Sequence, residues 1–138
     1  MRRRYASKDI AVSYDARTCI HAERCVHGAP EVFDPNARPW IQPDKAAADR
    51  LAAVIEKCPT GALRYERLDG GPPEAAPAAV AIALEKDGPI CVHGAMPLSE
   101  GAGNRYEDAG IRYALCRCGG SGNKPFCDGT HRTMGFEA

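Results

Sequence analysis

The sequence has no long apolar run, no excess of charge of either sign and few aromatic side chains. Its 18 basic and 18 acidic residues give a formal net charge of +0, so no general attraction to nucleic acid or to an anionic membrane is expected. No stretch is long and apolar enough to cross a bilayer, and no apolar segment follows the basic residues 2–4. We therefore predict neither a membrane span nor a secretory signal.

Cysteine is the residue that stands out, because the chain has seven of them. Secreted proteins built on disulfides usually carry an even number of cysteines and a signal peptide, and this sequence shows neither. We therefore expect a reducing, cytoplasmic compartment in which thiolates hold metal. A metal would also suit the low aromatic content, because units of roughly 50–70 residues often need a structural metal as well as a core.

A segment rich in proline and glycine divides the chain. Residues 69–77 hold three prolines and two glycines, which excludes a regular helix or an inner strand. We interpret it as a semi-rigid linker between an N-terminal module, residues 1–68, and a C-terminal module, residues 78–138.

Hydrophobic spacing predicts an α+β fold. In the first module we expect strands at 10–14, 32–33 and 63–68, and a helix between 47 and 58 with Asp44 as its N-cap and Pro59 after its end. In the second module we expect mostly short strands, at 80–84, 89–93 and 111–115, and a short helix near 128–134.

The densest group of metal-binding side chains lies near the C-terminal end. Cys116, Cys118, Cys127 and His131 form a complete four-ligand set for a soft or borderline metal. A helix starting at Asp128 would place Cys127 and His131 on one face. Zinc is an alternative, although the spacing of Cys116 and Cys118 is tighter than zinc sites usually have, and a disulfide is another.

The segment from Cys116 to His131 resembles the CDGSH iron–sulfur domain family, with Thr130 in place of the serine in the family's name. The resemblance extends over residues 85–138. It implies a small β-rich module and a [2Fe–2S] cluster held by Cys116, Cys118, Cys127 and His131. A neutral imidazole in place of a thiolate should raise the reduction potential, and its second nitrogen can titrate.

A second set of cysteines lies in the first module. Cys19 and Cys25 are six positions apart, and Cys58 is followed by Pro59, as in the closing ligand of bacterial-type ferredoxins. The middle cysteine that such proteins carry is replaced by Ala22. Residues 8–67 nevertheless resemble the divergent mono-cluster ferredoxin domain, which implies a ferredoxin-like fold and an iron–sulfur cluster.

The nuclearity of this first cluster stays open at this point. Three cysteines suit a [3Fe–4S] cluster, whereas [4Fe–4S] needs a fourth ligand from His21, Glu23, His27 or solvent. We expect the two histidines to lie at the surface or beside the cluster rather than to bind it. Buried structural cysteines are the alternative.

Cys91 and His93 are the remaining pair of metal-binding residue types. They are two positions apart on a predicted strand and therefore share a face. We expect them to serve core or interface packing rather than metal binding.

The sequence carries no nucleophile–base set, no phosphate loop and no cofactor fingerprint, so we expect a protein that transfers electrons between redox partner proteins and not an enzyme. Four basic residues near the sites could dock acidic partners: Arg17, Arg24, Arg117 and Lys124. A carrier or sensor that donates its [2Fe–2S] cluster is the second hypothesis. A zinc module that binds nucleic acid is the third, and the neutral net charge argues against it.

A homodimer is also expected, because proteins that resemble the CDGSH family often pair by sharing strands. The alternative is that the first module covers the same strand edges.

Overall fold

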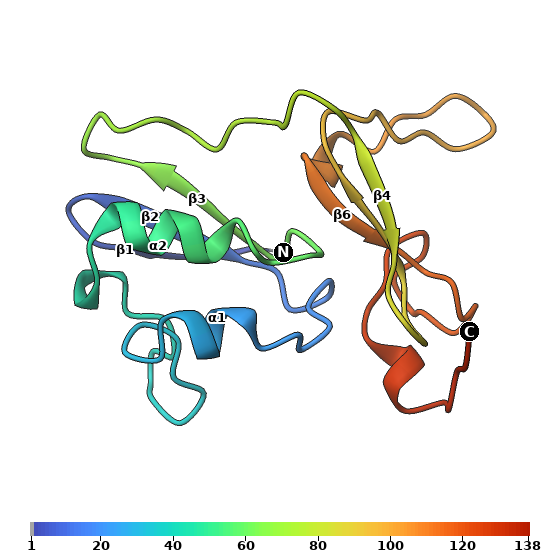
Figure 1. Cartoon of the computed structure of the whole chain (residues 1–138), viewed down its shortest axis with the longest axis horizontal. Helices are drawn as coiled ribbons and strands as arrows, with labels where there is room; N and C mark the ends of the chain where they lie inside the picture. Colours follow the sequence, from blue (N-terminus) through green and yellow to red (C-terminus); the bar gives the residue numbers. More distant parts are fainter. Residues whose placement is uncertain (1) are drawn as a thin grey trace. The chain divides into compact units, whose positions relative to one another are not determined.

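The computed structural model describes residues 2–138, which form two compact units (Figure 1). The first unit comprises the residues up to Ala16 together with 21–58 and 62–75, and the second comprises 17–20, 59–61 and 76–138. Two short pieces from the N-terminal half of the sequence thus belong to the second unit. The domain limits expected from the sequence, 1–68 and 78–138, remain a prediction about independent folding.

The first unit contains an antiparallel three-stranded sheet in the order β1-β2-β3. Its strands are β1 (Arg3–Ala6), β2 (Ile10–Tyr14) and β3 (Leu63–Arg67), and Val12 of β2 pairs with both Tyr5 and Tyr65. The helices are α1 (Arg24–Gly28), the 3₁₀ turn η1 (Pro43–Lys45) and α2 (Ala48–Ile55).

The core of the first unit lies between α2 and the sheet. Leu51 and Ile55 of α2 are fully buried. Ile10 and Val12 of β2 are also fully buried, as is Phe33 of the loop between α1 and η1. These side chains recur at helical spacing in α2 and alternate in β2, which is why the sequence pattern indicates both elements.

Several local predictions need correction in the first unit. The sequence pattern does not predict strand β1, and residues 32–33 form no strand: Phe33 makes only an isolated bridge to Ile41. Asp44 does not cap the helix, because it lies inside η1 and Ala47 precedes α2 instead. The helix also ends earlier than expected, at Ile55.

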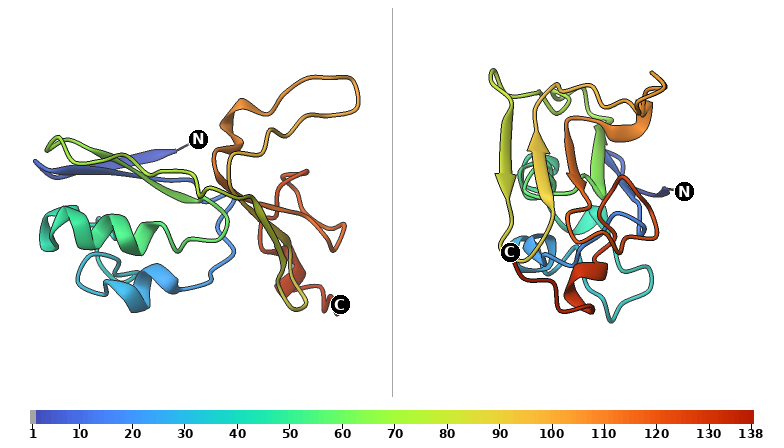
Figure 2. Two further views of the ribbon diagram at one scale, coloured as in Figure 1. Left: turned by 45° about the horizontal axis from the view of Figure 1, so that its top comes forward. Right: turned by 90° about the vertical axis from the view of Figure 1, so that its right-hand side faces the viewer.

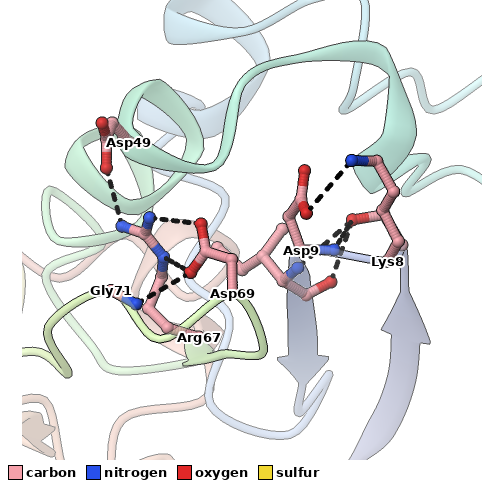
Figure 3. A network of polar contacts seen from close by, with 8 residues as sticks. Lys8, Asp9, Asp49, Arg67, Asp69 and Gly71 are labelled. Atoms are coloured by element: carbon pink, nitrogen blue, oxygen red, sulfur yellow. Dashed lines mark hydrogen bonds and ion pairs between the residues drawn. The ribbon is translucent and has the colours of Figure 1, made fainter.

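An ion-pair network joins α2, β3 and the residues that follow β3 (Figure 3). Arg67 donates hydrogen bonds of 2.8 Å to Asp49 and of 2.9 and 2.7 Å to Asp69, whose Oδ1 also accepts from the amide of Gly71. The bidentate contact with Arg67 and the amide of Gly71 lower the pKa of Asp69 to about 2. Arg67 thereby fixes the start of the proline-rich segment.

The second unit contains another antiparallel sheet, in the order β4-β5-β6 (Figure 2). Its strands are β4 (Ala81–Leu84), β5 (Ile90–His93) and β6 (Arg112–Leu115), with 3₁₀ turns at η2 (Glu107–Ala109) and η3 (Thr130–Arg132). Two sheets with few short helices make the chain α+β, as the sequence indicates.

The prediction of a helix near 128–134 is wrong, because only the single turn η3 forms there. Gly129 precedes this turn at φ 90°, a left-handed conformation in which an α-helix cannot continue. The side chain of Asp128 accepts a hydrogen bond from the amide of Thr130, the first residue of this turn.

The two faces of the second sheet pack against different partners. Val92 and Tyr113 belong to one cluster with Tyr106 and Phe126. Cys91 and Ala114, which pair across β5 and β6, belong to another cluster with Ile20 and Cys127. The hydrophobic cluster around Tyr113 is the aromatic core of the unit. The hydrophobic cluster around Ala114 lies beside the cysteine-rich loop.

Across residues 2–138, no helix combines the length and the apolar character that crossing a membrane requires.

Candidate metal centres

The C-terminal candidate site is a loop that starts where β6 ends. Two backbone hydrogen bonds close it, from the amide of Cys116 to the carbonyl of Pro125 (2.8 Å) and from the amide of Cys127 to the carbonyl of Ala114 (2.9 Å). Cys116 therefore directly follows β6, and the amide of Cys127 is held by Ala114 of the same strand.

Two polar side chains organise the interior of this loop. The hydroxyl of Ser121, which is buried, donates a 2.6 Å hydrogen bond to the carbonyl of Phe126 and accepts one from the amide of Asn123 (3.0 Å). Oδ2 of Asp128 accepts from the amide of Gly122 (2.8 Å), and Oδ1 accepts from the amide (3.0 Å) and the hydroxyl (2.5 Å) of Thr130. The hydroxyl of Thr130 lowers the pKa of Asp128 from its ordinary value.

This supporting role of Asp128 is not among the sequence predictions. The signal that could have found it is its position two residues before Thr130, because aspartate often accepts hydrogen bonds from the backbone two residues ahead.

The four candidate ligands of the loop form two pairs. The Sγ atoms of Cys116 and Cys118 are 3.9 Å apart, and Sγ of Cys127 is 3.3 Å from Nδ1 of His131. Two tetrahedral ligands on one metal, at bond lengths of about 2.0–2.3 Å, lie roughly 3.4–3.8 Å apart. Both pairs are therefore close to the separation that one shared metal atom requires.

The pairing suits a two-iron cluster, in which each iron takes two protein ligands. No group of three or more histidine, cysteine, aspartate or glutamate side chains within residues 2–138 is arranged to hold one metal ion. A mononuclear zinc site needs four ligands that converge on one point, whereas [2Fe–2S] needs two ligands on each iron. The donors of this loop fit the two-iron group.

The electrostatics of the loop favour the protonation states that bind metal at Cys116 and His131. Burial raises the pKa of the Cys116 thiol, but hydrogen bonds from the amides of Ser121 and Gly119 outweigh it, and the net pKa is lowered. Burial lowers the pKa of His131, which favours the neutral imidazole that a metal needs. Cys127, which is 4% exposed, has a pKa raised by burial, so a positive metal must offset that desolvation.

Arg117, between the first two cysteines, makes intramolecular contacts. It donates to the carbonyls of Gly88 (2.8 Å) and Glu85 (2.7 Å), and its guanidinium lies 5.4 Å from the centre of the Phe136 ring. Arg24 likewise donates to the carbonyl of Lys57 (3.3 Å). Both cations hold backbone of their own unit, whereas Lys124 is exposed.

The N-terminal candidates are partly buried thiols in different surroundings. Cys25 and Cys58 pack against the core of the first unit, and Cys19 lies in the segment 17–20 of the second unit. No disulfide bond joins any of the seven cysteines, all of which lie within residues 2–138. Each cysteine of a cubane cluster binds a different iron, so its ligands need not converge on one point as they do around a single ion. Three thiols bordering buried segments are donors of the type that such a cluster takes.

The backbone between Cys19 and Cys25 turns sharply. His21 and Glu23 have φ values of 56° and 61°, a left-handed conformation that costs a non-glycine residue roughly 1–2 kcal/mol. Such strain occurs often at ligand-binding segments. His21 and His27 are exposed, and Nε2 of His27 lies 3.8 Å from a carboxylate oxygen of Glu23.

Cys91 and His93 are not brought to either set of candidate ligands as a pair. Cys91 is partly buried in the cluster of Ile20, Ala114 and Cys127, so the expected role in packing is confirmed for it. His93 is exposed at the end of β5.

Two family models match this chain. Residues 5–68 match the family model described as a divergent 4Fe-4S mono-cluster, and residues 87–132 match the one described as an iron-binding zinc finger of CDGSH type. The protein called "Uncharacterized protein YjdI" of Escherichia coli strain K12 is 36% identical over 61 residues, which are 44% of this chain and 80% of that protein. The protein of the same name from Escherichia coli O157:H7 matches with the same values.

These findings define a protein with two iron–sulfur-binding domains. The chain belongs to the divergent 4Fe-4S mono-cluster family and carries a CDGSH-type iron-binding domain after it.

Proposed function

We propose that this chain transfers electrons between partner proteins by means of two iron–sulfur clusters. The observation that carries the proposal is the pairing of donors in the C-terminal loop, with Cys116 beside Cys118 and Cys127 beside His131. These four residues would hold a [2Fe–2S] cluster. The cluster supplies a one-electron redox couple, and the imidazole ligand raises its potential relative to four thiolates.

Cys19, Cys25 and Cys58 are the proposed ligands of the second cluster, in a module of ferredoxin-like fold. The match to a 4Fe-4S family supports four irons, and three cysteine ligands support the alternative [3Fe–4S]. The protein residues that could complete a [4Fe–4S] site are His21, Glu23 and His27, and solvent is the other source.

Electron carriage needs a partner on each side, so the proposed partners are redox proteins in the cytoplasm. We propose no enzymatic activity and no binding to nucleic acid or membrane. The exposed Lys124 suits docking to an acidic partner better than Arg117 or Arg24, whose guanidinium groups hold backbone carbonyls. A homodimer is also part of the proposal, because the residues of β4 are exposed along its whole length.

Donation of the [2Fe–2S] cluster to other proteins is the second candidate function. Cys116 and Cys118 are partly exposed, and Gly119 and Gly120 beside them are exposed. An acceptor thiol could therefore reach the cluster from this side.

Electron paramagnetic resonance on anaerobically purified full-length protein tests the proposal. We expect a [2Fe–2S] signal after dithionite reduction that His131→Ala abolishes and that the control Cys91→Ser retains. A signal in the oxidised protein identifies [3Fe–4S], and a second reduced signal identifies [4Fe–4S]. Silence in both states, with zinc in the sample, would overturn the function.

Mixing the loaded protein with an apo-ferredoxin separates the two candidates. Electron carriage leaves the [2Fe–2S] cluster on this chain after the apo-ferredoxin has been separated from it. Transfer of iron and sulfide to the acceptor favours cluster donation.

A further inference from the structure

The segment that carries Cys19 packs against the cysteine-rich loop inside the second unit. Ile20 is 8% exposed and packs in one hydrophobic cluster with Ala114, Cys127 and Cys91. Ile20 directly follows Cys19, a proposed ligand of the first iron–sulfur cluster. It therefore lies beside Cys127, a proposed ligand of the [2Fe–2S] cluster. This placement is not explained by the binding of either cluster alone.

A hydrogen bond with a charged donor holds the same segment. Nη1 of Arg132 lies 2.9 Å from the carbonyl oxygen of Ile20, across 112 positions of sequence. Arg132 directly follows His131, and Gly129 lies so close that a Cβ there would be 3.5 Å from the carbonyl oxygen of Cys19. The side chain of Arg132, next to the proposed ligand His131, thus contacts the backbone of Ile20, next to Cys19.

Residues 59–61, which follow Cys58, contact strand β6 within the second unit. Gly61, at φ 68°, lies against the carbonyl oxygen of Arg112, so that a Cβ at this position would overlap that oxygen. Arg112 begins β6, which ends one residue before Cys116. Residues 59–61 belong to the second unit together with β6.

We propose that these contacts couple the two cluster-binding loops, so that each cluster binds more tightly when the other is present. A bound cluster orders its own loop, and an ordered loop 17–20 presents a fixed carbonyl to Arg132 and a fixed side chain to Cys127. The coupling must be reciprocal, because it is a property of the equilibrium between the two loops. This inference rests on the proposed function, since it assumes both ligand sets.

A double-mutant cycle on full-length protein tests the coupling. The rate at which an iron chelator removes the [2Fe–2S] cluster is followed by its visible absorption in four proteins: wild type, Cys25→Ser, Arg132→Gln and the double variant. Cys25→Ser removes a proposed ligand of the first cluster and leaves residues 17–20 unchanged. We expect it to speed loss of the [2Fe–2S] cluster about fivefold, the lower end of coupling between two sites.

The expected result in the Arg132→Gln background is that Cys25→Ser has less than a twofold effect. Arg38→Gln is the matched control, because Arg38 also donates to backbone carbonyls, those of Pro35 and Ala37, but within its own loop. The fivefold effect should persist in that background. Ile20→Ala provides an independent variant if Arg132→Gln folds poorly, and amide hydrogen exchange at 127–132 should rise in both.

Each other outcome decides a different question. Equal effects of Cys25→Ser in the wild-type and Arg132→Gln backgrounds would mean that Arg132 only stabilises the fold, and would overturn the coupling while leaving electron transfer intact. A chain that never binds a cluster in its first module would overturn the proposed function and the coupling with it.

Discussion

Nδ1 of His131 faces the Cys127 thiol at 3.3 Å, while Nε2 faces the turn between β4 and β5, where a Cβ at Gly88 would lie 3.5 Å away. The two ring nitrogens therefore have different surroundings. Nδ1 is the nitrogen available to a metal shared with Cys127, and Nε2 remains for the protein and for solvent. This division gives the clearest test of the C-terminal site.

His131→Cys should keep the cluster and lower its reduction potential. The substitution replaces a neutral ligand by a thiolate, which adds one negative charge beside the iron, and we expect a fall on the order of 100 mV or more. A redox titration followed by electron paramagnetic resonance measures it. His131→Ala serves as the comparison and should lose the cluster. An unchanged potential in His131→Cys would show that His131 is not a ligand.

Asp128→Ala should loosen the cysteine-rich loop without removing a ligand. The carboxylate accepts hydrogen bonds from the amides of Gly122 and Thr130 and from the hydroxyl of Thr130. Their loss should lower the free energy of unfolding by about 2 kcal/mol, because hydrogen bonds to charged groups are stronger than neutral ones. Chemical denaturation of the loaded protein gives the value.

Asp44→Ala is the matched control for Asp128, because Asp44 is exposed. It should change the free energy of unfolding by less than about 0.5 kcal/mol. Equal effects of the two substitutions would remove Asp128 from the loop's support.

The strands β2 to β6 could be predicted from sequence because each carries apolar residues, although those of β4 are exposed. Strand β1 could not, since Arg3 and Arg4 are exposed and the strand pairs on one side only, with β2. The spacing of Cys127 and His131 suits a helix, but the left-handed Gly129 overrides that pattern and leaves a single turn at 130–132.

The candidate metal ligands could be identified from the sequence, but the residues that hold the backbone around them could not. The motif places Cys116, Cys118, Cys127 and His131 in one segment, so their proximity follows from chain connectivity. The contact of Ile20 with Arg132 joins residues far apart in sequence, and no local pattern encodes such a pair. The role of Arg117 was also hidden, because an arginine beside a site suits either docking or holding the backbone.

Gly61→Ala should destabilise the second unit more than Gly103→Ala does. At φ 68° any Cβ costs roughly 1–2 kcal/mol, and at Gly61 it would also overlap the carbonyl oxygen of Arg112. We expect a total loss of about 3 kcal/mol or more in the free energy of unfolding. Gly103→Ala separates the two causes, because Gly103 has φ 93° and a Cβ there would meet nothing within 4 Å among residues 2–138 beyond its chain neighbours. It should cost about 1 kcal/mol, and an equal loss at both positions would mean that the contact with Arg112 is unimportant.

The ion pair of Asp69 with Arg67 should make the first unit sensitive to acid in a defined window. The pKa of Asp69 is about 2 in the folded chain, below its ordinary value of 3.8. A depressed pKa means that the carboxylate stabilises the fold fully above about pH 4, and that this contribution is lost as the pH falls toward 2. Denaturant midpoints of wild type and Asp69→Asn, measured between pH 2 and pH 7, should differ most near neutrality and converge at the acid end. The difference should also shrink in high salt, because the Asp69 side chain is 28% exposed and dissolved ions screen its charge. A difference that does not depend on pH would show that Asp69 acts through its shape and not through its charge.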